Sequence, residues 1–191
     1  QRFCSFSQKK SSAHEHAEYP KPVVMTLTNL LGLSEGELTS FVNKHDEHRF
    51  RATQLVKWIH QAGIDKFDDM TNLSKTLRER LCSIAIVEGP SVVDHHISND
   101  GTHKWLFRID QSNSVETVYI PEPGRGTLCV SSQVGCPLNC DFCATAKQGF
   151  NRNLTSSEII GQLWQVMRIG KKDSLPVKIS NIVMMGWENL F

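Results

Sequence analysis

Three cysteines, Cys136, Cys140 and Cys143, lie within eight residues of the segment VGCPLNCDFCATAKQGF. Free cysteine often serves as a small buried hydrophobe, but the Pro, Asn and Asp between these three are untypical of a core. A structural zinc ion takes four ligands, commonly as two close pairs, and the only other nearby thiol is Cys129. Iron–sulfur clusters are also held by thiolates, four when every iron is bound by the protein. Three thiolates leave one iron open, so we favour a cluster that does chemistry over structural zinc.

Composition sets the broad class of the protein. The chain has 191 residues, 39% of them hydrophobic, and a net charge of +1, so a nucleic-acid partner has to be met by a local basic patch. No apolar run approaches the roughly 20 residues that span a bilayer, and we expect no membrane association. The first ten residues resemble no secretory signal and lack an initiator Met. Clustered cysteines without such a signal indicate metal or redox chemistry in the cytoplasm.

The first half of the chain has helical patterns. We expect a flexible tail over residues 1–22 and a helical domain over 23–90. Ser34 and Glu37 have the spacing of a capping box before a helix, and apolar spacing predicts further helices over 50–59 and 73–84. The opposite faces of these two helices carry basic residues, namely Arg49, Arg51, Lys57, His60, Lys75, Arg78 and Arg80.

Strand patterns follow Gly89-Pro90. Short β-like runs and turn signals predict a β-hairpin region over residues 91–126, which ends in a linker over 121–126. From residue 127 a strand over 127–131, the cysteine loop, a helix over 155–169 and a strand over 181–185 form a βαβ unit of a parallel sheet. The predicted class is therefore α/β, with a helical domain and a small hairpin region before the parallel core.

The spacing Cys-x-x-x-Cys-x-x-Cys after the first strand of a parallel α/β unit resembles the radical S-adenosylmethionine (SAM) superfamily. That resemblance implies a [4Fe-4S] cluster on Cys136, Cys140 and Cys143, whose open iron chelates SAM. It also implies that Phe142 packs near the SAM adenine, and that residues 127–191 are the first part of a partial (β/α)6 barrel.

The flanks resemble one family within that superfamily. The segments RFRATQLVKWIH, FDDMTNLSKTLRERL and ETVYIPEPGRGTLCVSSQVGCPLNCDFCATAKQGFNRNLTSSEIIGQ are similar to the RlmN-type methyltransferases. The resemblance implies methylation of C2 of an adenosine in 23S rRNA, and of the adenosine beside the anticodon in tRNA, by a monomer. It implies a helical domain that helps hold RNA and an electron donor such as flavodoxin or a ferredoxin. A sister group that methylates C8 shares the cluster motif and is the alternative.

The resemblance also assigns roles to single residues. In the family, one SAM methylates a cysteine near the C-terminus, and a radical from a second SAM takes a hydrogen from that methyl. The carbon radical adds to C2, and a second cysteine resolves the protein–RNA adduct. Cys129 matches that second cysteine, against the alternative of a buried strand cysteine. Glu116 matches a proposed proton-transfer carboxylate, against the alternative of a solvent-facing strand glutamate.

Two basic residues near the cysteines, Lys147 and Arg152, are candidate phosphate contacts, although each alone is also typical of a solvated surface. His95, His96 and His103 have no partner in the sequence that would make them metal ligands. Family members continue after this region with Met-Gly-x-Gly-Glu-Pro, whereas this chain has MGWENLF. Glu188 is then the candidate counterpart of the carboxylate that binds the SAM amino group. We expect a truncated enzyme that is inactive alone, with an RNA-binding fragment or a zinc-stabilised module as alternatives.

Overall fold

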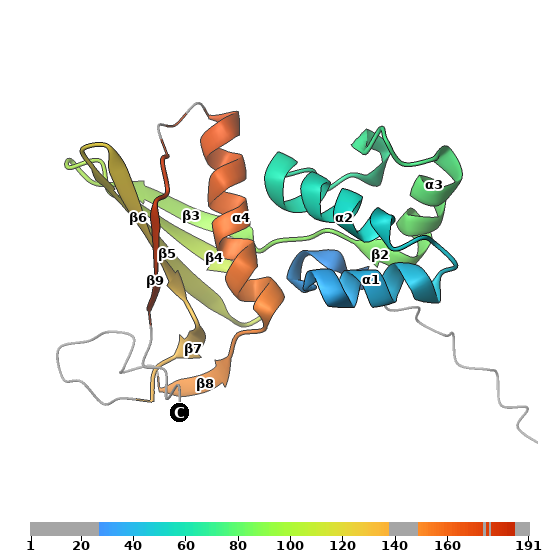
Figure 1. Ribbon diagram of the computed structural model, residues 1–191. Coiled ribbons are helices and arrows are strands. Elements are labelled where there is room, and N and C mark those ends of the chain that lie inside the picture. Colours follow the sequence, from blue (N-terminus) through green and yellow to red (C-terminus); the bar gives the residue numbers. More distant parts are fainter. Residues whose placement is uncertain (1–26, 138–148, 174, 176, 186–191) are drawn as a thin grey trace, which may run out of the picture.

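The computed structural model of this chain describes residues 27–137, 149–173, 175 and 177–185. A helical half and a β-sheet half lie on opposite sides of one long helix, α4 (Ser156–Lys172) (Figure 1). None of the helices in the described part of the chain has both the length and the apolar character to cross a membrane.

The helical half confirms the predicted helices. Ser34 is the N-cap of helix α1 (Glu35–Lys44), and Ser34 and Glu37 form the reciprocal capping box that their spacing predicts. Helix α2 (Phe50–Val56) continues as a π-helical turn over Lys57–Ala62. Ser74 is the N-cap of helix α3 (Lys75–Ile84), and its side chain accepts a hydrogen bond from the Leu77 N–H.

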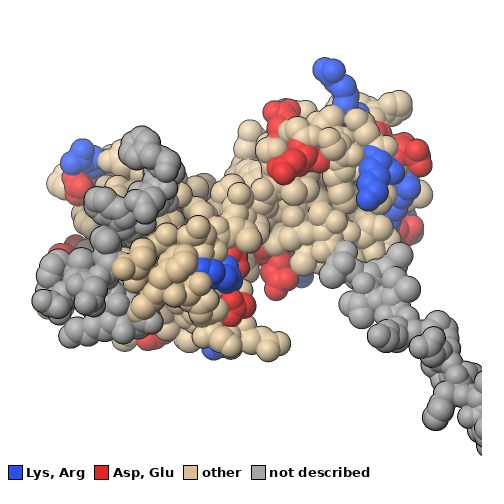
Figure 2. All heavy atoms as spheres, turned by 90° about the horizontal axis from the view of Figure 1, so that it is seen from below, with Lys and Arg blue, Asp and Glu red and all other residues tan. Residues whose placement is uncertain are grey.

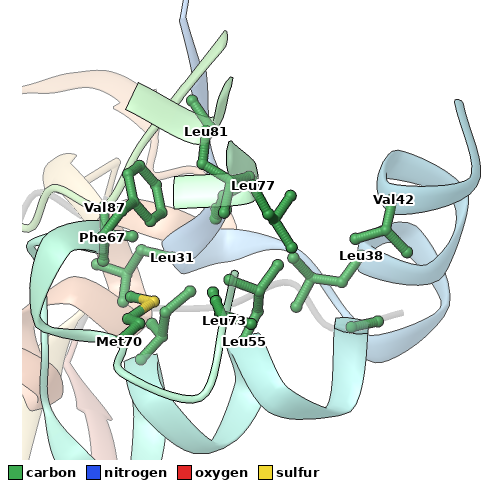
Figure 3. Close-up of a cluster of buried hydrophobic side chains, with 14 of the residues drawn as sticks. Leu31, Leu38, Val42, Leu55, Phe67, Met70, Leu73, Leu77, Leu81 and Val87 are labelled. Carbon is green, nitrogen blue, oxygen red and sulfur yellow. The ribbon is translucent and has the colours of Figure 1, made fainter. Parts of the chain in front are cut away.

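Apolar side chains at helical spacing form the core of this half. They come from every helix and from the connecting turns (Figure 3). Leu31, Leu38, Leu55, Ile59 and Met70 are completely buried. A short parallel pair, β1 (Thr28–Asn29) with β2 (Ala85–Ile86), joins the start of the half to its end. Two 3-10 turns, over Leu30–Gly32 and Phe67–Asp69, complete it.

The second half is a five-stranded sheet with the order β3-β4-β5-β6-β9. Strands β3 to β6 are an antiparallel meander, and β9 adds parallel to β6 (Figure 1). The strands have the bounds β3 (Ser91–Ile97), β4 (His103–Arg108), β5 (Ser114–Glu122), β6 (Arg125–Ser131) and β9 (Asn181–Met185).

The predicted linker over residues 121–126 is wrong. Strands β5 and β6 pair up to Glu122 and Arg125, so only Pro123 and Gly124 turn the chain. Gly124 has a φ of 78°, a conformation that tight turns assign to glycine. Pro and Gly suit a linker and a turn equally well, and the pairing of the flanking residues decides between them. The hairpin region and the parallel core therefore share one sheet.

Helix α4 forms the crossover between β6 and β9, which confirms the predicted βαβ unit. Its Val166 packs on the sheet, in a core that includes Trp105, Phe107, Leu128 and Val130. Its Trp164 points to the other side and is buried in the core of the helical half. One helix thus completes two cores. The remainder of a partial barrel stays a prediction.

Candidate active site

The candidate site lies on the face of the sheet that α4 does not cover. Along β6, Leu128 and Val130 are buried beneath α4, whereas Thr127, Cys129 and Ser131 are half-buried. This alternation follows from the pleat, which directs successive side chains to opposite faces. Cys129 pairs across β6 with Val118 of β5 on one side and with Val183 of β9 on the other. The thiol therefore stands in the middle of three strands.

Glu116 shares this face with Cys129. It lies two residues before Val118, the cross-strand partner of Cys129, and a spacing of two keeps side chains on one face. The Glu116 Oε1 atom is 3.1 Å from the Nζ of Lys104 on β4, and both side chains are about half exposed, at 52% and 49%. Sequence reasoning missed Lys104, because the pair depends on the β4–β5 register. The ion pair links the Glu116 side chain of β5 to β4.

Burial raises the pKa of the Cys129 thiol above its ordinary value. The thiol is therefore protonated at neutral pH, and a reaction that needs the thiolate also needs a nearby base. Glu116 is the carboxylate on the same face of the adjacent strand. The two groups share one face of the sheet, and a proton transfer between them stays a prediction.

Cys136 begins a loop whose two ends are held together. Strand β7 (Gln133–Gly135) pairs antiparallel with β8 (Phe150–Asn153), and the Cys136 N–H donates to the Gly149 carbonyl oxygen at 3.2 Å. A Cβ atom on Gly135 would lie 1.8 Å from that same oxygen, and Gly135 has a φ of 75°. Only glycine fits there. We call the β7–β8 pair with Gly135 and Gly149 the neck.

The rest of the predicted cluster and cofactor set falls outside the described residues. This applies to Cys140, Phe142, Cys143, Lys147 and Glu188. Within the described part of the chain, no three His, Cys, Asp or Glu side chains gather as metal ligands.

The described part of the loop does fit a thiolate-bound cluster. Cys136 is a free, half-buried cysteine at the neck, and soft thiolates are the ligands that iron–sulfur clusters use. The neck holds residues 136 and 149 within hydrogen-bonding distance, and a cluster on Cys136 stays a prediction.

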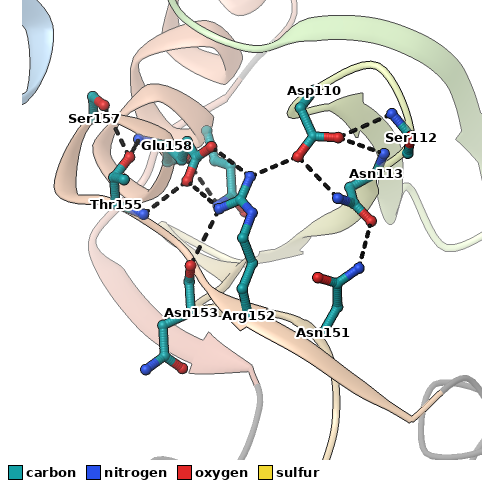
Figure 4. A network of polar contacts seen from close by, with 10 residues as sticks. Asp110, Ser112, Asn113, Asn151, Arg152, Asn153, Thr155, Ser157 and Glu158 are labelled. Carbon is teal, nitrogen blue, oxygen red and sulfur yellow. Dashed lines mark hydrogen bonds and ion pairs between the residues drawn. The ribbon is translucent and has the colours of Figure 1, made fainter.

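Arg152, the second predicted phosphate contact, lies inside an ion-pair network (Figure 4). Its guanidinium donates to both carboxylate oxygens of Glu158 at 2.9 Å and to Asp110 at 2.8 Å. Hydrogen bonds from Asn113 and then Arg152 hold the pKa of Asp110 far below its usual range. The network ties β8 to the β4–β5 turn and to the start of α4. Arg152 therefore has a structural role here, and its contact with RNA stays a prediction.

Two of the basic residues on the predicted helices make contacts within the helical half. Arg78 donates to the Asp68 carbonyl, and Arg80 donates to the His45 carbonyl. Arg49 and Lys57 are exposed. On the face seen in Figure 2, basic and acidic side chains are interspersed rather than gathered into one basic patch.

Two of the three histidines of the hairpin region pack with each other, and the third pairs with an aspartate. His95 Nε2 lies 3.0 Å from His103 Nδ1, and both rings stack with Trp105. His96 pairs with Asp94 at 2.8 Å. These contacts are structural.

Comparisons with known proteins were consistent with one another. The family model of the ribosomal RNA large subunit methyltransferase N-terminal domain matches residues 28–87. The dual-specificity RNA methyltransferase RlmN of Saccharophagus degradans is 55% identical over 160 residues, which cover 83% of this chain and 40% of that protein. The RlmN of Marinobacter nauticus is 55% identical over 159 residues, with coverages of 83% and 43%.

A solved structure is also similar. It is the crystal structure of a radical SAM methyltransferase from Sphaerobacter thermophilus, with a TM-score of 0.74 and 36% sequence identity. The match covers 83% of this chain and 47% of that one. This chain therefore spans about two fifths of the length of the curated relatives it matches.

Proposed function

We infer that this chain belongs with the RlmN-type radical SAM RNA methyltransferases, because it is 55% identical to one RlmN over 83% of its own length. We propose that it supplies their reaction with a cluster loop, a resolving cysteine and a proton-transfer carboxylate. The proposed reaction is methylation of C2 of an adenosine in 23S rRNA and in tRNA beside the anticodon. The observation that carries the proposal is the common face of β5 and β6, where Glu116 and Cys129 stand on adjacent strands, close in sequence to the neck at Cys136.

Cys136, Cys140 and Cys143 would hold a [4Fe-4S] cluster, which with SAM bound supplies a 5′-deoxyadenosyl radical. The other steps that we assign use the chain's own residues. Cys129 provides the thiol that releases the RNA adenosine from its covalent link to the enzyme. Glu116, oriented by Lys104 at 3.1 Å, moves the proton that this release requires. Residues 28–87, which match the N-terminal domain of such enzymes, contact the RNA.

A chimera tests this proposal directly. Residues 27–185 replace the corresponding segment of the Saccharophagus degradans relative, and 23S rRNA and tRNA from cells that depend on the chimera are digested and analysed by mass spectrometry. We expect 2-methyladenosine. Finding 8-methyladenosine would establish the sister reaction, and finding neither would contradict the proposal.

Matched variants of the chimera separate the assigned roles. Cys136→Ser is expected to abolish both cluster binding and methylation. Cys129→Ser is expected to abolish methylation while the cluster remains. We further propose that the 191 residues alone do not complete methyl transfer, because they span 40% to 43% of the relatives' length.

A further inference from the structure

Strands β5 and β6 separate next to the candidate site, although nothing in their sequences interrupts them. Their pairing runs from Glu122 and Arg125 to Val118 and Cys129. Continued by two residues, the same register would pair Glu116 with Ser131. That backbone pair does not form.

The side chain of Gln162, from α4, takes the place of the missing partner. Its Oε1 accepts a hydrogen bond from the Ser131 N–H at 2.8 Å, and its Nε2 donates to the Ser131 carbonyl at 2.9 Å. A side-chain amide carries the same donor and acceptor as a backbone amide, so Gln162 pairs with Ser131 as a neighbouring strand would. Ser131 Oγ in turn donates to the Glu116 carbonyl at 2.7 Å.

Every hydrogen-bonding position of the Gln162 amide is used. Oε1 also accepts from Thr117 Oγ1 at 2.8 Å, and Nε2 also donates to the Glu158 carbonyl at 3.2 Å. Gln162 and Thr117 are both fully buried, at 0% exposure. A buried polar group with all its hydrogen bonds made fixes one arrangement, because any other leaves unpaired groups away from water.

From this arrangement we infer that Gln162 is a positioning residue, which sets the separation of Glu116 and Cys129 by holding β5 and β6 apart. Gln162 touches neither functional side chain. It acts through the backbone of Ser131, two residues from Cys129, and through the Ser131 hydroxyl that contacts the Glu116 carbonyl. The effect of this separation on catalysis rests on the proposed function. The separation itself is independent of that proposal.

The first test measures the geometry and needs no activity. In the 191-residue chain, Cys4, Cys82, Cys136, Cys140 and Cys143 are changed to Ser, and Glu116→Cys is added as a partner for Cys129. The chain is then treated with bifunctional thiol reagents of increasing length. Mass spectrometry measures which linker lengths join the two cysteines. Gln162→Met removes all four hydrogen bonds at nearly constant volume. Thr117→Val is the matched control, because it removes one buried hydrogen bond of Gln162 and leaves both bonds to Ser131.

We expect Gln162→Met to shift the preferred linker to a shorter length, because Ser131 is then able to pair with the backbone of residue 116. Thr117→Val should keep the parent profile. If Gln162→Met does not fold, Gln162→Glu replaces it, because the glutamate keeps the acceptor for the Ser131 N–H and loses the donor to the Ser131 carbonyl. A Gln162 variant with the linker profile of Thr117→Val would overturn the inference.

The second test uses the chimera described above. We expect Gln162→Met to lower kcat for adenosine methylation roughly 10- to 100-fold, the size of effect that misplaced reacting groups have, with the KM for RNA and the formation of 5′-deoxyadenosine unchanged. A parallel loss of methylated adenosine and 5′-deoxyadenosine would mean a merely structural role and contradict the inference. If the unsubstituted chimera itself makes no methylated adenosine, the proposed function fails, and the linker profiles still decide the role of Gln162.

Discussion

The indole Nε1 of Trp164 donates a hydrogen bond to the backbone carbonyl oxygen of Ile59 at 2.8 Å. Trp164 lies on α4, whereas Ile59 belongs to the helical half. The Arg168 guanidinium covers the same indole at 4.4 Å from its centroid and pairs with Asp65 at 2.7 Å. The helix that positions the sheet is therefore also part of the domain expected to hold RNA, so the two halves should unfold together.

Replacing Trp164 tests this coupling. Trp164→Ala should lower the free energy of unfolding by about 3–5 kcal/mol, because it empties a large site in a closely packed core. Trp164→Phe should cost about 1–3 kcal/mol, because the Ile59 carbonyl loses its donor. Urea unfolding of each variant measures both values. Met167→Ala is the control on the same helix, since Met167 is 41% exposed, and a Trp164→Ala chain no less stable than this control would contradict the coupling.

Gly135 should be indispensable for the cluster loop. Gly135→Ala places a methyl group against the Gly149 carbonyl and a side chain at a positive φ, so the neck opens next to Cys136. We expect bound iron, measured after anaerobic reconstitution, to fall to the level of Cys136→Ser. Gly36→Ala is the matched control. A Cβ there meets nothing within 4 Å, and inside α1 alanine should stabilise by about 0.5–1 kcal/mol. Full iron content in Gly135→Ala would show that the neck is not needed.

The raised pKa of Cys129 predicts how its thiol reacts. Because burial favours the protonated form, alkylation by iodoacetamide at pH 8 should be slower in the native chain than in the urea-unfolded chain. The native rate should then rise with pH to a midpoint above the ordinary range of cysteine. The exposed Cys82 is the internal control, followed by peptide mass spectrometry. Equal native and unfolded rates for Cys129 would refute the prediction.

The same shift has a consequence for stability. A thiol whose pKa is raised by folding stabilises the native state below its unfolded pKa, and that contribution is lost as the pH rises through the folded pKa. We therefore expect Cys129→Ala to remove part of the alkaline fall in the melting temperature. A parallel pH dependence in the wild type and the variant would contradict this.

The Arg152 network should lose stability as the pH falls, whereas Cys129 costs stability as the pH rises. The pKa of Asp110 is lowered in the folded chain, so its contribution is present above the unfolded pKa, near 4, and is lost as the pH falls through the folded value. Arg152→Gln should speed amide exchange over residues 150–153 near pH 7, and the difference from wild type should shrink in acid. Lys75→Gln, which breaks a pair whose lysine side chain is 83% exposed, is the control. An Arg152→Gln chain with unchanged exchange at pH 7 would contradict the anchoring role.

Local signals in the sequence predicted the elements well and their connections less well. The helix capped by Ser34 and the strand over 181–185 agree with the structure, because capping and apolar runs are encoded within a few residues. The Pro123-Gly124 turn was missed, because the same dipeptide serves linkers and hairpins and only the β5–β6 pairing distinguishes them.

The candidate site was predictable where the type and spacing of the residues indicate the chemistry. Cysteine spacing pointed to Cys136, and the family resemblance pointed to Cys129 and Glu116. Lys104 and Gln162 were not found, because an ion pair across two strands and an amide inserted beside Ser131 depend on register and on the placement of α4. Gln162 on the buried side of an amphipathic helix was the one available signal, since a buried glutamine needs partners.

The identity of the metal tests the central claim most directly. The 191-residue chain, reconstituted anaerobically with iron and sulfide and desalted, should contain about four irons and four sulfides per chain and show the electron paramagnetic resonance of a reduced [4Fe-4S] cluster. Both should be absent when Cys136, Cys140 and Cys143 are changed to Ala. A chain that retains zinc and takes up neither iron nor sulfide would contradict the account.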